Sequence, residues 1–326
     1  MKEINFRQAI GEALDEEMER DPRVFIIGTD VGVMGGLMGE MGGLYYKYGA
    51  ERVRDTPISE AGVLGAAIGA AITGMRPVAQ MRFYDFLGCA YDDVLNGMTK
   101  IRYMTGGQVT VPLVLTGLSG AGRRAAAQHS QSLEGMLMSI PGLKIVIPST
   151  SCDAKGLLKS SIRDDNPVLY FHHKMLMWSG PKSEVPEKEY AIPLGQADIK
   201  RDGGDVTVIA TGYMVHRALN AAEKLQREQR ISLEIIDPRT VVPFDKETVL
   251  NSVQKTGRLV IFTEESKTGS FASEIAGIVA EEAFDNLDAP IKRVNAPNTP
   301  VPYGAVMEDF WMPDENKLIQ AVNEIV

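Results

Sequence analysis

Residues Asp55–Gly74 read DTPISEAGVLGAAIGAAITG. They open with a turn at Asp55-Thr56-Pro57, and after Glu60 no charged residue follows until Arg76. The larger apolar residues recur at the spacing of a helix; they are Val63, Leu64, Ala67, Ile68, Ala71 and Ile72. Mostly Gly and Ala lie between them. A helix without charge on any face is either buried or in a membrane, and a span needs about 20 apolar residues. We therefore expect a buried helix.

Glu60 is the one carboxylate of this stretch that adjoins the helix, and it lies where the polar turn meets the apolar run. One interpretation is a first-turn carboxylate that the helix dipole stabilises. The other is a functional carboxylate at the rim of a core, since active sites are often built from such groups. The residues alone leave both open.

The composition is that of an ordinary globular protein. Hydrophobic residues make up 44% and charged residues 24%, which excludes a disordered chain. The 34 basic and 43 acidic residues give a net charge of −9, and no run of Lys and Arg predicts nucleic-acid binding. Cys89 and Cys152 show no spacing typical of zinc or of a disulfide framework. No apolar run predicts a signal peptide or a membrane span, so we expect a cytoplasmic protein.

Short apolar strands alternate with helical stretches through residues 1–175, which we expect to form the first domain. Continuous apolar strands of this kind are typical of a parallel sheet covered on both faces. The expected strands are Val24–Ile27, Pro77–Phe83, Val111–Leu115, Leu143–Pro148 and Val168–Phe171. The expected helices are Asn5–Glu19, the Asp55–Gly74 helix, Asp85–Met104, Leu133–Ser139 and Asp153–Arg163.

A segment rich in Pro, Lys and Glu then interrupts the pattern, and we expect a linker at residues 176–195. A second α/β series follows in residues 196–326. Its expected strands are Val206–Ala210, Leu233–Ile236, Leu259–Phe262 and Ile291–Val294, and its expected helices are His216–Arg227, Lys246–Lys255, Ser270–Ala283 and Pro313–Val326. The sequence thus predicts an α/β fold of two domains, each a mainly parallel sheet flanked by helices.

Familiar catalytic motifs are missing. The glycine-rich run at residues 28–43 follows a strand, but its spacing fits neither a dinucleotide-binding loop nor a phosphate-binding P-loop. The alternative is a mobile surface loop, and loops of this length are often functional. Gly117-Leu-Ser119-Gly-Ala falls one glycine short of a hydrolase nucleophile motif.

His129 is the histidine best placed for chemistry. It lies in a polar loop, Gln-His-Ser, between an expected strand and an expected helix. Loops at the carboxyl ends of parallel strands are where α/β sheets bind ligands. An acid–base role and a loop-stabilising hydrogen bond both remain open. The adjacent His172 and His173 point to opposite faces of a strand, so they cannot chelate one metal together.

Four long segments resemble one known family. They are DTPISEAGVLGAAIGAAITGMRPVAQMRFYDF, AAAQHSQSLEG, PGLKIVIPSTSCDAKGLLKSSIRDDNPVLYF and IDPRTVVPFD. They are similar to the β subunit of the E1 component of thiamine-diphosphate-dependent 2-oxo acid dehydrogenases, a family that includes pyruvate, branched-chain and acetoin enzymes. The resemblance covers nearly the whole chain. It implies a transketolase-like pyrimidine-binding domain followed by a transketolase C-terminal-like domain.

The resemblance also implies roles for individual residues. Glu60 matches the glutamate that hydrogen-bonds the aminopyrimidine ring of the cofactor and so helps to remove the thiazolium proton. Phe86 matches the aromatic residue that packs on that ring, and Ile58 is a further expected cofactor contact. His129 matches an active-site histidine near the reacting carbon. Positions that hold a structural potassium ion in related subunits match Leu113, Ser161, Ile162, Asp164 and Asn166; taken alone, the Asp164–Asn166 turn more simply predicts a chain reversal.

A partner chain is implied as well. This chain lacks the Gly-Asp-Gly motif with which thiamine-diphosphate enzymes hold Mg²⁺ and the diphosphate. The resemblance therefore implies an α2β2 heterotetramer in which the E1 α subunit supplies that half of the site. It further implies acyl transfer to the lipoyl domain of an E2 core.

Two departures from the family bear on substrate and mechanism. Thr29 stands where many relatives have a glutamate, so no role is carried over to it. The segment Phe171–Lys174 resembles acetoin-type subunits more than pyruvate-type subunits. The resemblance thus favours cleavage of acetoin, with pyruvate or a branched-chain 2-oxo acid as alternatives. A non-catalytic scaffold subunit and a transketolase-like carboligase are the competing functions, and the chain length argues against the carboligase.

Overall fold

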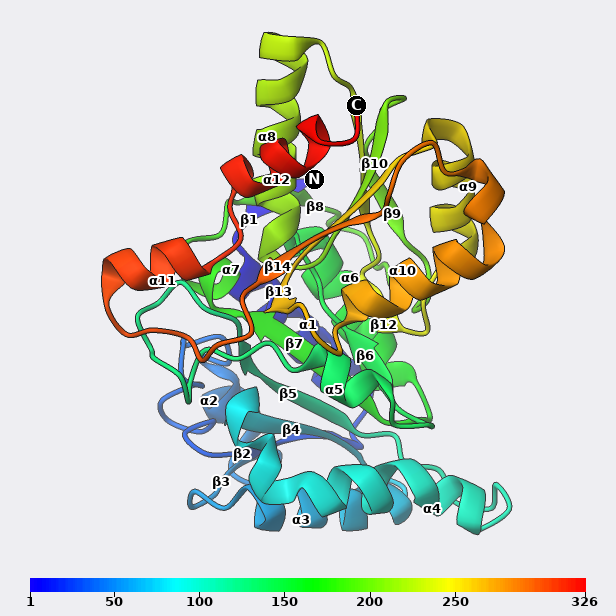
Figure 1. The fold of residues 1–326 in the computed structure, drawn as a ribbon. Helices are drawn as coiled ribbons and strands as arrows, with labels where there is room; N and C mark the ends of the chain where they lie inside the picture. Colours follow the sequence, from blue (N-terminus) through cyan, green and yellow to red (C-terminus); the bar gives the residue numbers. More distant parts are fainter. The chain divides into compact units, whose positions relative to one another are not determined.

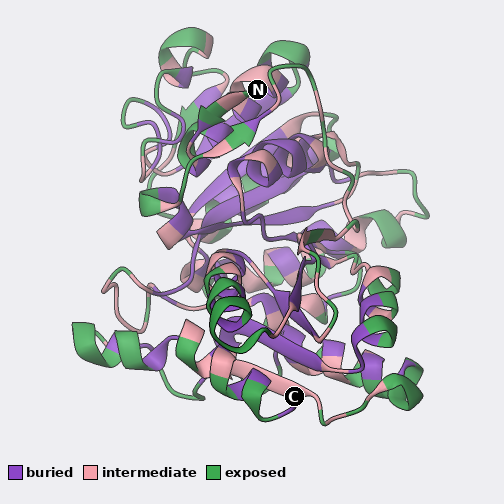
Figure 2. Ribbon diagram, turned by 90° about the horizontal axis from the view of Figure 1, so that it is seen from above, coloured by how far each residue is buried: buried purple, intermediate pink, exposed green.

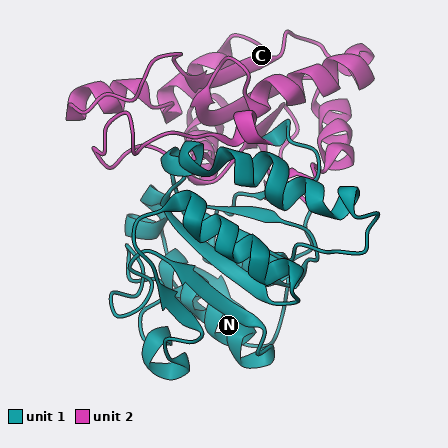
Figure 3. Ribbon diagram, turned by 90° about the horizontal axis from the view of Figure 1, so that it is seen from below, with its two compact units in different colours: residues 1–119, 138–194 teal, residues 120–137, 195–326 magenta.

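Parallel sheets flanked by helices form both halves of the chain, so the predicted α/β fold is confirmed (Figure 1). The computed structural model describes residues 1–326. It divides into a first unit, residues 1–119 and 138–194, and a second unit, residues 120–137 and 195–326 (Figure 3). Each unit is described by itself, because their relative positions are not determined. The predicted linker at residues 176–195 stays a prediction, and the segment Gly120–Leu137 belongs to the second unit.

The first unit is built on a sheet in which each neighbouring pair of strands is parallel. Its strands, in spatial order, are β6 (Lys144–Val146), β7 (Val168–His173), β5 (Val114–Ser119), β4 (Arg76–Phe83), β2 (Val24–Gly28) and β3 (Val53–Asp55). The central strands are buried on both faces, as their continuous apolar runs predicted (Figure 2). A separate antiparallel pair, β1 (Lys2–Ile4) with β8 (Ser183–Val185), had no signal in the sequence pattern.

Helices cover both faces of this sheet (Figure 1). On one face lie α1 (Phe6–Arg20), α6 (Ser151–Arg163) and α7 (Lys174–Ser179), and α1 packs along α6. The other face carries α3 (Glu60–Ile72) and the segment that leads to α4 (Thr99–Met104). The short helix α2 (Leu44–Tyr48) ends the glycine-rich loop, and α5 (Glu134–Met138) follows the loop that carries His129.

The single helix expected at Asp85–Met104 is wrong in detail. The chain forms a 3₁₀ segment, η1 (Tyr84–Ala90), then a π-helical segment, η2 (Asp93–Met98), and only then α4. The Thr99 hydroxyl donates to the carbonyls of Val94 and Leu95, five and four residues back, at 3.0 and 2.8 Å. The Thr99 hydroxyl thus forms its hydrogen bonds at the end of the wider π-helical segment. A periodic pattern of apolar residues does not reveal such a segment.

Helix α3 is not buried on every side. The periodic residues Val63, Leu64, Ala67, Ile68 and Ala71 face the core as predicted, but Ile72 is 43% exposed. The opposite face is exposed in this chain and consists of small residues, Ala61, Gly62, Gly65 and Ala66. The expectation that this helix is buried on every side was therefore wrong for the isolated chain. The helix lacks charged residues because one face packs in the core and the opposite, exposed face consists of Gly and Ala.

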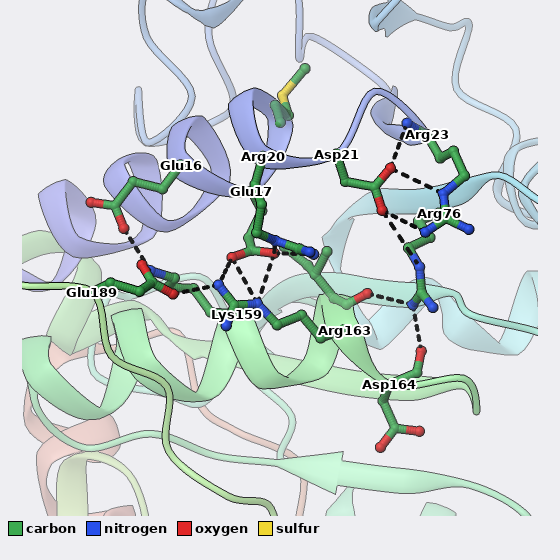
Figure 4. Close-up of polar contacts among 12 residues, drawn as sticks. Glu16, Glu17, Arg20, Asp21, Arg23, Arg76, Lys159, Arg163, Asp164 and Glu189 are labelled. Atoms are coloured by element: carbon green, nitrogen blue, oxygen red, sulfur yellow. Dashed lines mark hydrogen bonds and ion pairs between the residues drawn. The ribbon is translucent and has the colours of Figure 1, made fainter.

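Helices α1 and α6 are joined by ion pairs, in which each helix contributes one completely buried charge (Figure 4). The Glu17 carboxylate is completely buried and accepts from Arg20 at 2.8 Å and from Arg163 at 2.5 Å. The Lys159 ammonium is also completely buried, and it donates to Glu16 at 2.8 Å and to Glu189. Because every buried charge here has an opposite charge beside it, the contact tolerates polar residues that a core would otherwise reject.

At the end of α1, the Arg23 guanidinium donates to both carboxylate oxygens of Asp21, at 3.0 and 2.8 Å, and lowers the pKa of Asp21 to about 2. A lowered folded-state pKa stabilises the fold above the unfolded value of 3.8, and this contribution is lost as the pH falls toward 2. We expect Asp21→Asn to remove about 2 kcal/mol of this acid-dependent stability. Urea denaturation of both proteins between about pH 5 and pH 2 measures it; parallel curves would contradict the expectation.

The second unit holds a smaller sheet with the order β14 (Lys292–Ala296), β13 (Leu259–Ser266), β10 (Val206–Ala210), β11 (Leu233–Asp237), β9 (Asp198–Arg201). All pairs are parallel except β11 with β9, an antiparallel edge strand that the sequence pattern did not predict. Helices α8 (Tyr213–Gln229) and α12 (Glu315–Asn323) pack on one face, and α9 (Lys246–Thr256) and α10 (Phe271–Glu282) on the other (Figure 1). The remaining elements are β12 (Thr240–Val242), η3 (Phe284–Asn286) and α11 (Ala305–Trp311).

None of the helices combines the length and the apolar composition that crossing a membrane would require.

Candidate functional site

Glu60 lies beside a small pocket in the first unit, at the carboxyl ends of β2 and β3 and against β4. It is the first residue of α3, directly after Ser59 at the N-cap. The pocket has a volume of about 30 Å³ and is lined by Thr29, Ile58, Ser59, Glu60, Val63, Leu64, Gln80, Met81, Arg82 and Leu115. A carboxylate at a helix N-terminus is stabilised by the helix dipole. Glu60 is therefore a polar group set against a mainly apolar wall.

Glu40 supports one wall of this pocket from behind. The Gln80 amide nitrogen donates to Glu40 Oε1 at 3.1 Å, and the Thr116 hydroxyl donates to the Gln80 amide oxygen. The second oxygen of Glu40 accepts from the Met38 backbone N–H at 2.9 Å. Glu40 is only 3% exposed, and burial raises the pKa of its carboxyl. The side chain of Gln80 is thus held in one orientation where it lines the pocket.

The glycine-rich run at residues 28–43 is a packed loop: Val31 and Met41 are completely buried. Gly36 has a φ of 87° and lies against the Glu40 carboxylate, where an added Cβ would come within 2.7 Å of the carboxyl carbon. Only glycine meets both conditions without strain. The loop therefore brings Glu40 under the pocket wall, while Val33 and Met34 lie exposed at the surface.

His129 lies in the segment Gly120–Leu137 of the second unit, and Glu308 anchors the beginning of that segment. The completely buried Glu308 carboxylate accepts from the backbone N–H groups of Gly122 and Arg124 at 2.9 and 3.0 Å. The Arg124 guanidinium donates to Glu308 at 2.5 Å and to Asp309 at 2.8 Å. Arg124 has a φ of 57°, a conformation costly for a residue with a side chain. The Glu308 contacts hold this strained turn in place.

Two more carboxylates hold other parts of the same segment. Glu264 accepts from the N–H of Ala121, and Glu265 accepts from the N–H of Gly135 at 3.0 Å. Glu134 is buried beside them, and one of its carboxyl oxygens has no hydrogen-bond partner. Burial and the neighbouring carboxylates raise the pKa of Glu134, and burial raises the pKa of Glu265. At least one proton is therefore shared by this group near neutrality.

Two backbone carbonyls at the predicted potassium positions accept hydrogen bonds from one arginine (Figure 4). The Arg76 guanidinium donates to the carbonyl oxygens of Ile162 and Asp164 at 2.9 and 3.0 Å. The Leu113 carbonyl accepts from the N–H of Val168 at 2.9 Å. Since each carbonyl oxygen has two lone pairs, these contacts leave an acceptor site on each oxygen.

Side-chain oxygens at the same positions are more fully engaged. The Asp164 carboxylate accepts from Lys144 and, at 2.8 Å, from the Asn166 backbone N–H, and the Lys144 contact contributes to a lowered pKa of Asp164 against the cost of burial. The Asn166 amide oxygen accepts from Arg102 at 2.5 Å. Ser161 donates its hydroxyl hydrogen to the Leu157 carbonyl at 2.7 Å. The backbone carbonyls are therefore the less engaged acceptors for a cation here.

Profiles of two domain families match the chain. The transketolase pyrimidine binding domain matches residues 2–178, and the transketolase C-terminal domain matches residues 195–318. The β subunit of acetoin:2,6-dichlorophenolindophenol oxidoreductase from Bacillus subtilis is 47% identical over 99% of this chain and 97% of its own length. The 2-oxoisovalerate dehydrogenase β subunit of the same organism is 45% identical over 100% of this chain and 99% of its own. This chain belongs to the E1 β-subunit family.

The pyruvate dehydrogenase E1 β subunit of Bacillus subtilis is 40% identical to this β subunit, over 100% of this chain and 99% of its own. A solved split-gene transketolase, described as an inactive β4 tetramer, superposes with a TM-score of 0.81 at 22% identity and covers 99% of this chain and 98% of that one. That likeness supports the fold alone. The resemblance inferred from the sequence is confirmed, and this β subunit is part of a thiamine-diphosphate-dependent oxidoreductase.

The structure brings some of the predicted site residues together. Glu60 and Ile58 line the same pocket, and Ile58 is 70% exposed at its mouth. Phe86 lies in η1 beside Phe83, with ring centroids 6.4 Å apart, and does not line that pocket. His129 belongs to the other unit. The catalytic and cofactor roles of these residues stay predictions.

Sequence reasoning missed the supporting carboxylates. Glu264 and Glu265 lie near the carboxyl end of β13, just beyond the strand expected at Leu259–Phe262, and this place was a usable signal. Glu40 and Glu308 gave none, because each sits alone in a stretch without a recognisable period. Thr29, to which no role was assigned, lines the pocket, and its hydroxyl donates to the Pro57 carbonyl at 3.3 Å.

A raised carboxyl pKa predicts how this β subunit responds to pH. Because the folded state keeps the proton of Glu134 that the unfolded state loses, stability is greatest below the unfolded pKa of 4.5 and falls as the pH rises toward neutrality. Glu134→Gln, which cannot ionise, should raise the free energy of unfolding at about pH 8 by about 1–3 kcal/mol and change it little at about pH 5. Urea titrations at both pH values test this; an equal effect at each pH would refute the assignment.

Proposed function

We propose that this β subunit supplies the pyrimidine half of a thiamine diphosphate site, and that an α subunit supplies the half that holds Mg²⁺ and the diphosphate. The observation that carries the proposal is a lone carboxylate, Glu60, in an apolar-walled pocket of a chain without a Gly-Asp-Gly motif. The carboxylate and the apolar side chains of this lining have the chemistry to meet the edge and the face of a planar heteroaromatic ring.

Thiamine diphosphate, when bound, supplies a carbon nucleophile that attacks a substrate carbonyl. In the proposal, the Glu60 carboxyl holds a proton at the ring nitrogen of the aminopyrimidine. Val63, Leu64 and Leu115 keep water from that side of the ring. His129 moves a proton at the substrate oxygen, a role that histidine side chains commonly take in catalysis.

The exposed face of α3 supports a tight contact with a partner helix. Ala61, Gly62, Gly65 and Ala66 present no side chain larger than a methyl group. A face of this kind lets two backbones approach closely, and it would explain why the helix carries no charge after Glu60. We assign this face to the E1 α subunit in an α2β2 assembly, with E2 lipoyl domains as the acyl acceptor and the cytoplasm as the location.

Acetoin is the proposed first substrate, with pyruvate and branched-chain 2-oxo acids as alternatives. The acetoin-enzyme β subunits of Bacillus subtilis and Cupriavidus necator are 47% and 46% identical, against 45% and 40% for the branched-chain and pyruvate subunits. The difference in identity between the acetoin-type and branched-chain-type subunits is small, and the α subunit also shapes the substrate pocket. Acetoin is therefore the substrate to test first, followed by the 2-oxo acids.

The test is co-expression of this chain with an E1 α subunit, followed by calorimetry with thiamine diphosphate and Mg²⁺. The assembly should bind the cofactor and reduce a dye with acetoin or a 2-oxo acid, whereas the β chain alone should do neither. An assembly that forms but binds no cofactor would overturn the proposal in favour of a scaffold subunit.

A potassium ion, if held, would lie on the backbone carbonyls of the predicted positions, which are those of Leu113, Ser161, Ile162, Asp164 and Asn166. A ligand that binds only the folded state stabilises it by about 1–3 kcal/mol at concentrations ten- to a hundredfold above its Kd. We therefore expect the thermal midpoint of the assembly to be higher in potassium chloride than in choline chloride of equal ionic strength. Equal midpoints would argue that contacts within the chain, such as those of Arg76 with Ile162 and Asp164, leave no need for a cation at these carbonyls.

A further inference from the structure

A second cavity, unrelated to the Glu60 pocket, opens in the second unit. It lies where β13 and β14 end and α10 begins, at the carboxyl ends of parallel strands (Figure 1). Its volume is about 720 Å³, within the range of pockets that hold small organic ligands. The lining residues are Lys267, Thr268, Gly269, Ser273, Arg293, Asn295, Ala296, Pro297, Asn298, Phe310 and Lys317.

Three of the lining residues are cationic and none is acidic, in a chain whose net charge is −9. Lys267, Arg293 and Lys317 form no ion pair with any carboxylate. Their positive charge is reinforced by the N-terminus of α10, which begins at Phe271 beside the cavity. An unneutralised group of this kind attracts an anion.

Arg293 is held in a fixed orientation at the cavity wall. One guanidinium nitrogen, Nη1, donates to the Lys267 carbonyl at 3.1 Å and to the Ser273 hydroxyl at 2.6 Å. The other two nitrogens, Nε and Nη2, make no hydrogen bond within the chain. A guanidinium with one edge anchored and its other donors free is suited to bind phosphate oxygens.

Lys317 and Phe310 form a second wall with a different character. The Lys317 ammonium donates to the carbonyls of Phe310 and Met312 at 2.5 and 2.7 Å and lies 5.3 Å from the centroid of the Phe310 ring. The Phe310 side chain is 79% exposed, and Ala296 and Pro297 continue the apolar surface. A bare phosphate would leave this apolar surface unused.

We propose that this cavity binds a small organic phosphate, with the phosphate on Lys267 and Arg293 and a planar apolar group against Phe310. Two neighbouring cations and the hydroxyl of Thr268 match the charge and the oxygens of a phosphate dianion. The inference goes beyond the proposed function and is independent of it, since no residue assigned to thiamine diphosphate lines the cavity.

The experiment is calorimetric titration of the assembled enzyme, saturated with thiamine diphosphate and Mg²⁺, using three probes. They are adenosine monophosphate, adenosine, and inorganic phosphate. Adenosine monophosphate should bind more tightly than either of the others, and its affinity should fall as salt is added. Equal binding of adenosine would overturn the role of the phosphate, and equal binding of inorganic phosphate would overturn the role of the Phe310 wall.

Two variants locate the binding site. Lys267 is exposed, so Lys267→Gln should preserve the fold; it should weaken binding about tenfold, as should Arg293→Gln. Lys224→Gln on α8 removes the same charge from an exposed position outside the cavity and should leave the affinity unchanged. If Lys267→Gln binds the probe as wild type does, or if Lys224→Gln weakens binding equally, the proposal is wrong.

Discussion

Replacing Glu60 by glutamine in the assembled enzyme is expected to lower kcat by about 10²- to 10⁴-fold, the range typical of losing a general acid–base group. Glutamine keeps the size of the side chain and one acceptor oxygen, but it cannot share a proton with the cofactor ring. Cofactor affinity should therefore change far less than turnover, because the apolar wall of the pocket is intact. Steady-state kinetics with saturating thiamine diphosphate measure the first quantity, and calorimetry measures the second.

A matched control separates this effect from a general change of charge. Glu51 is 92% exposed and pairs only with Arg54, so Glu51→Gln should leave kcat unchanged. A Glu60→Gln assembly with wild-type turnover would remove Glu60 from the chemistry. The carboxylate would then be what its position at the start of α3 first indicated, a residue that stabilises the helix N-terminus.

Glu308→Ala is expected to have the largest effect on stability, a loss of about 3 kcal/mol. The change leaves the N–H groups of Gly122 and Arg124 without their buried acceptor and releases the Arg124 guanidinium. Because Glu308 contacts the segment that carries His129, kcat should fall in the folded enzyme, while thiamine diphosphate affinity should stay nearly unchanged. Urea denaturation gives the first value, and kinetics below the unfolding range give the second.

Asp309 offers the comparison on the same helix. Its carboxylate also pairs with Arg124, at 2.8 Å, but it is 66% exposed, and exposed ion pairs contribute at most about 1 kcal/mol. Asp309→Ala should therefore be close to wild type in stability and turnover. If Glu308→Ala and Asp309→Ala behave alike, the buried carboxylate has no special role in positioning the segment. In that case Glu308→Gln, which keeps one acceptor, would not restore the stability or kcat lost in Glu308→Ala.

The sequence pattern was most informative where one physical effect dominates. The core strands were found because burial on both faces demands continuous apolar residues, and β13 is an example. The strands that it missed are β1, β3, β8, β9 and β12. Each has only three or four residues, of which at least one is not fully buried, so no period marks them. Helix α3 shows a different limit of the sequence pattern: because the helix carries no charge after Glu60, the pattern could not distinguish its core face from its flat exposed face.

In the candidate site, too, the sequence was informative only where a single local effect dominates. Glu60 could be predicted because it stands next to a long uncharged run. The contacts that organise the surroundings of Glu60 and His129, such as Glu40 with Gln80 and Glu308 with Gly122, join residues far apart in the chain. Those contacts depend on the tertiary fold, and no local period in the sequence carries them. Long-range polar contacts of this kind are found only when the chain is folded.

The place of the segment Gly120–Leu137 has a practical consequence for protein engineering. The segment is encoded within the first half of the gene, yet its anchors, Glu264, Glu265 and Glu308, are encoded in the second. A chimera that exchanges C-terminal halves between relatives at residues 176–195 would separate the segment Gly120–Leu137 from the carboxylates that accept its hydrogen bonds. Recombination that transfers residues 120–137 together with residues 195–326 keeps the two as one inherited block.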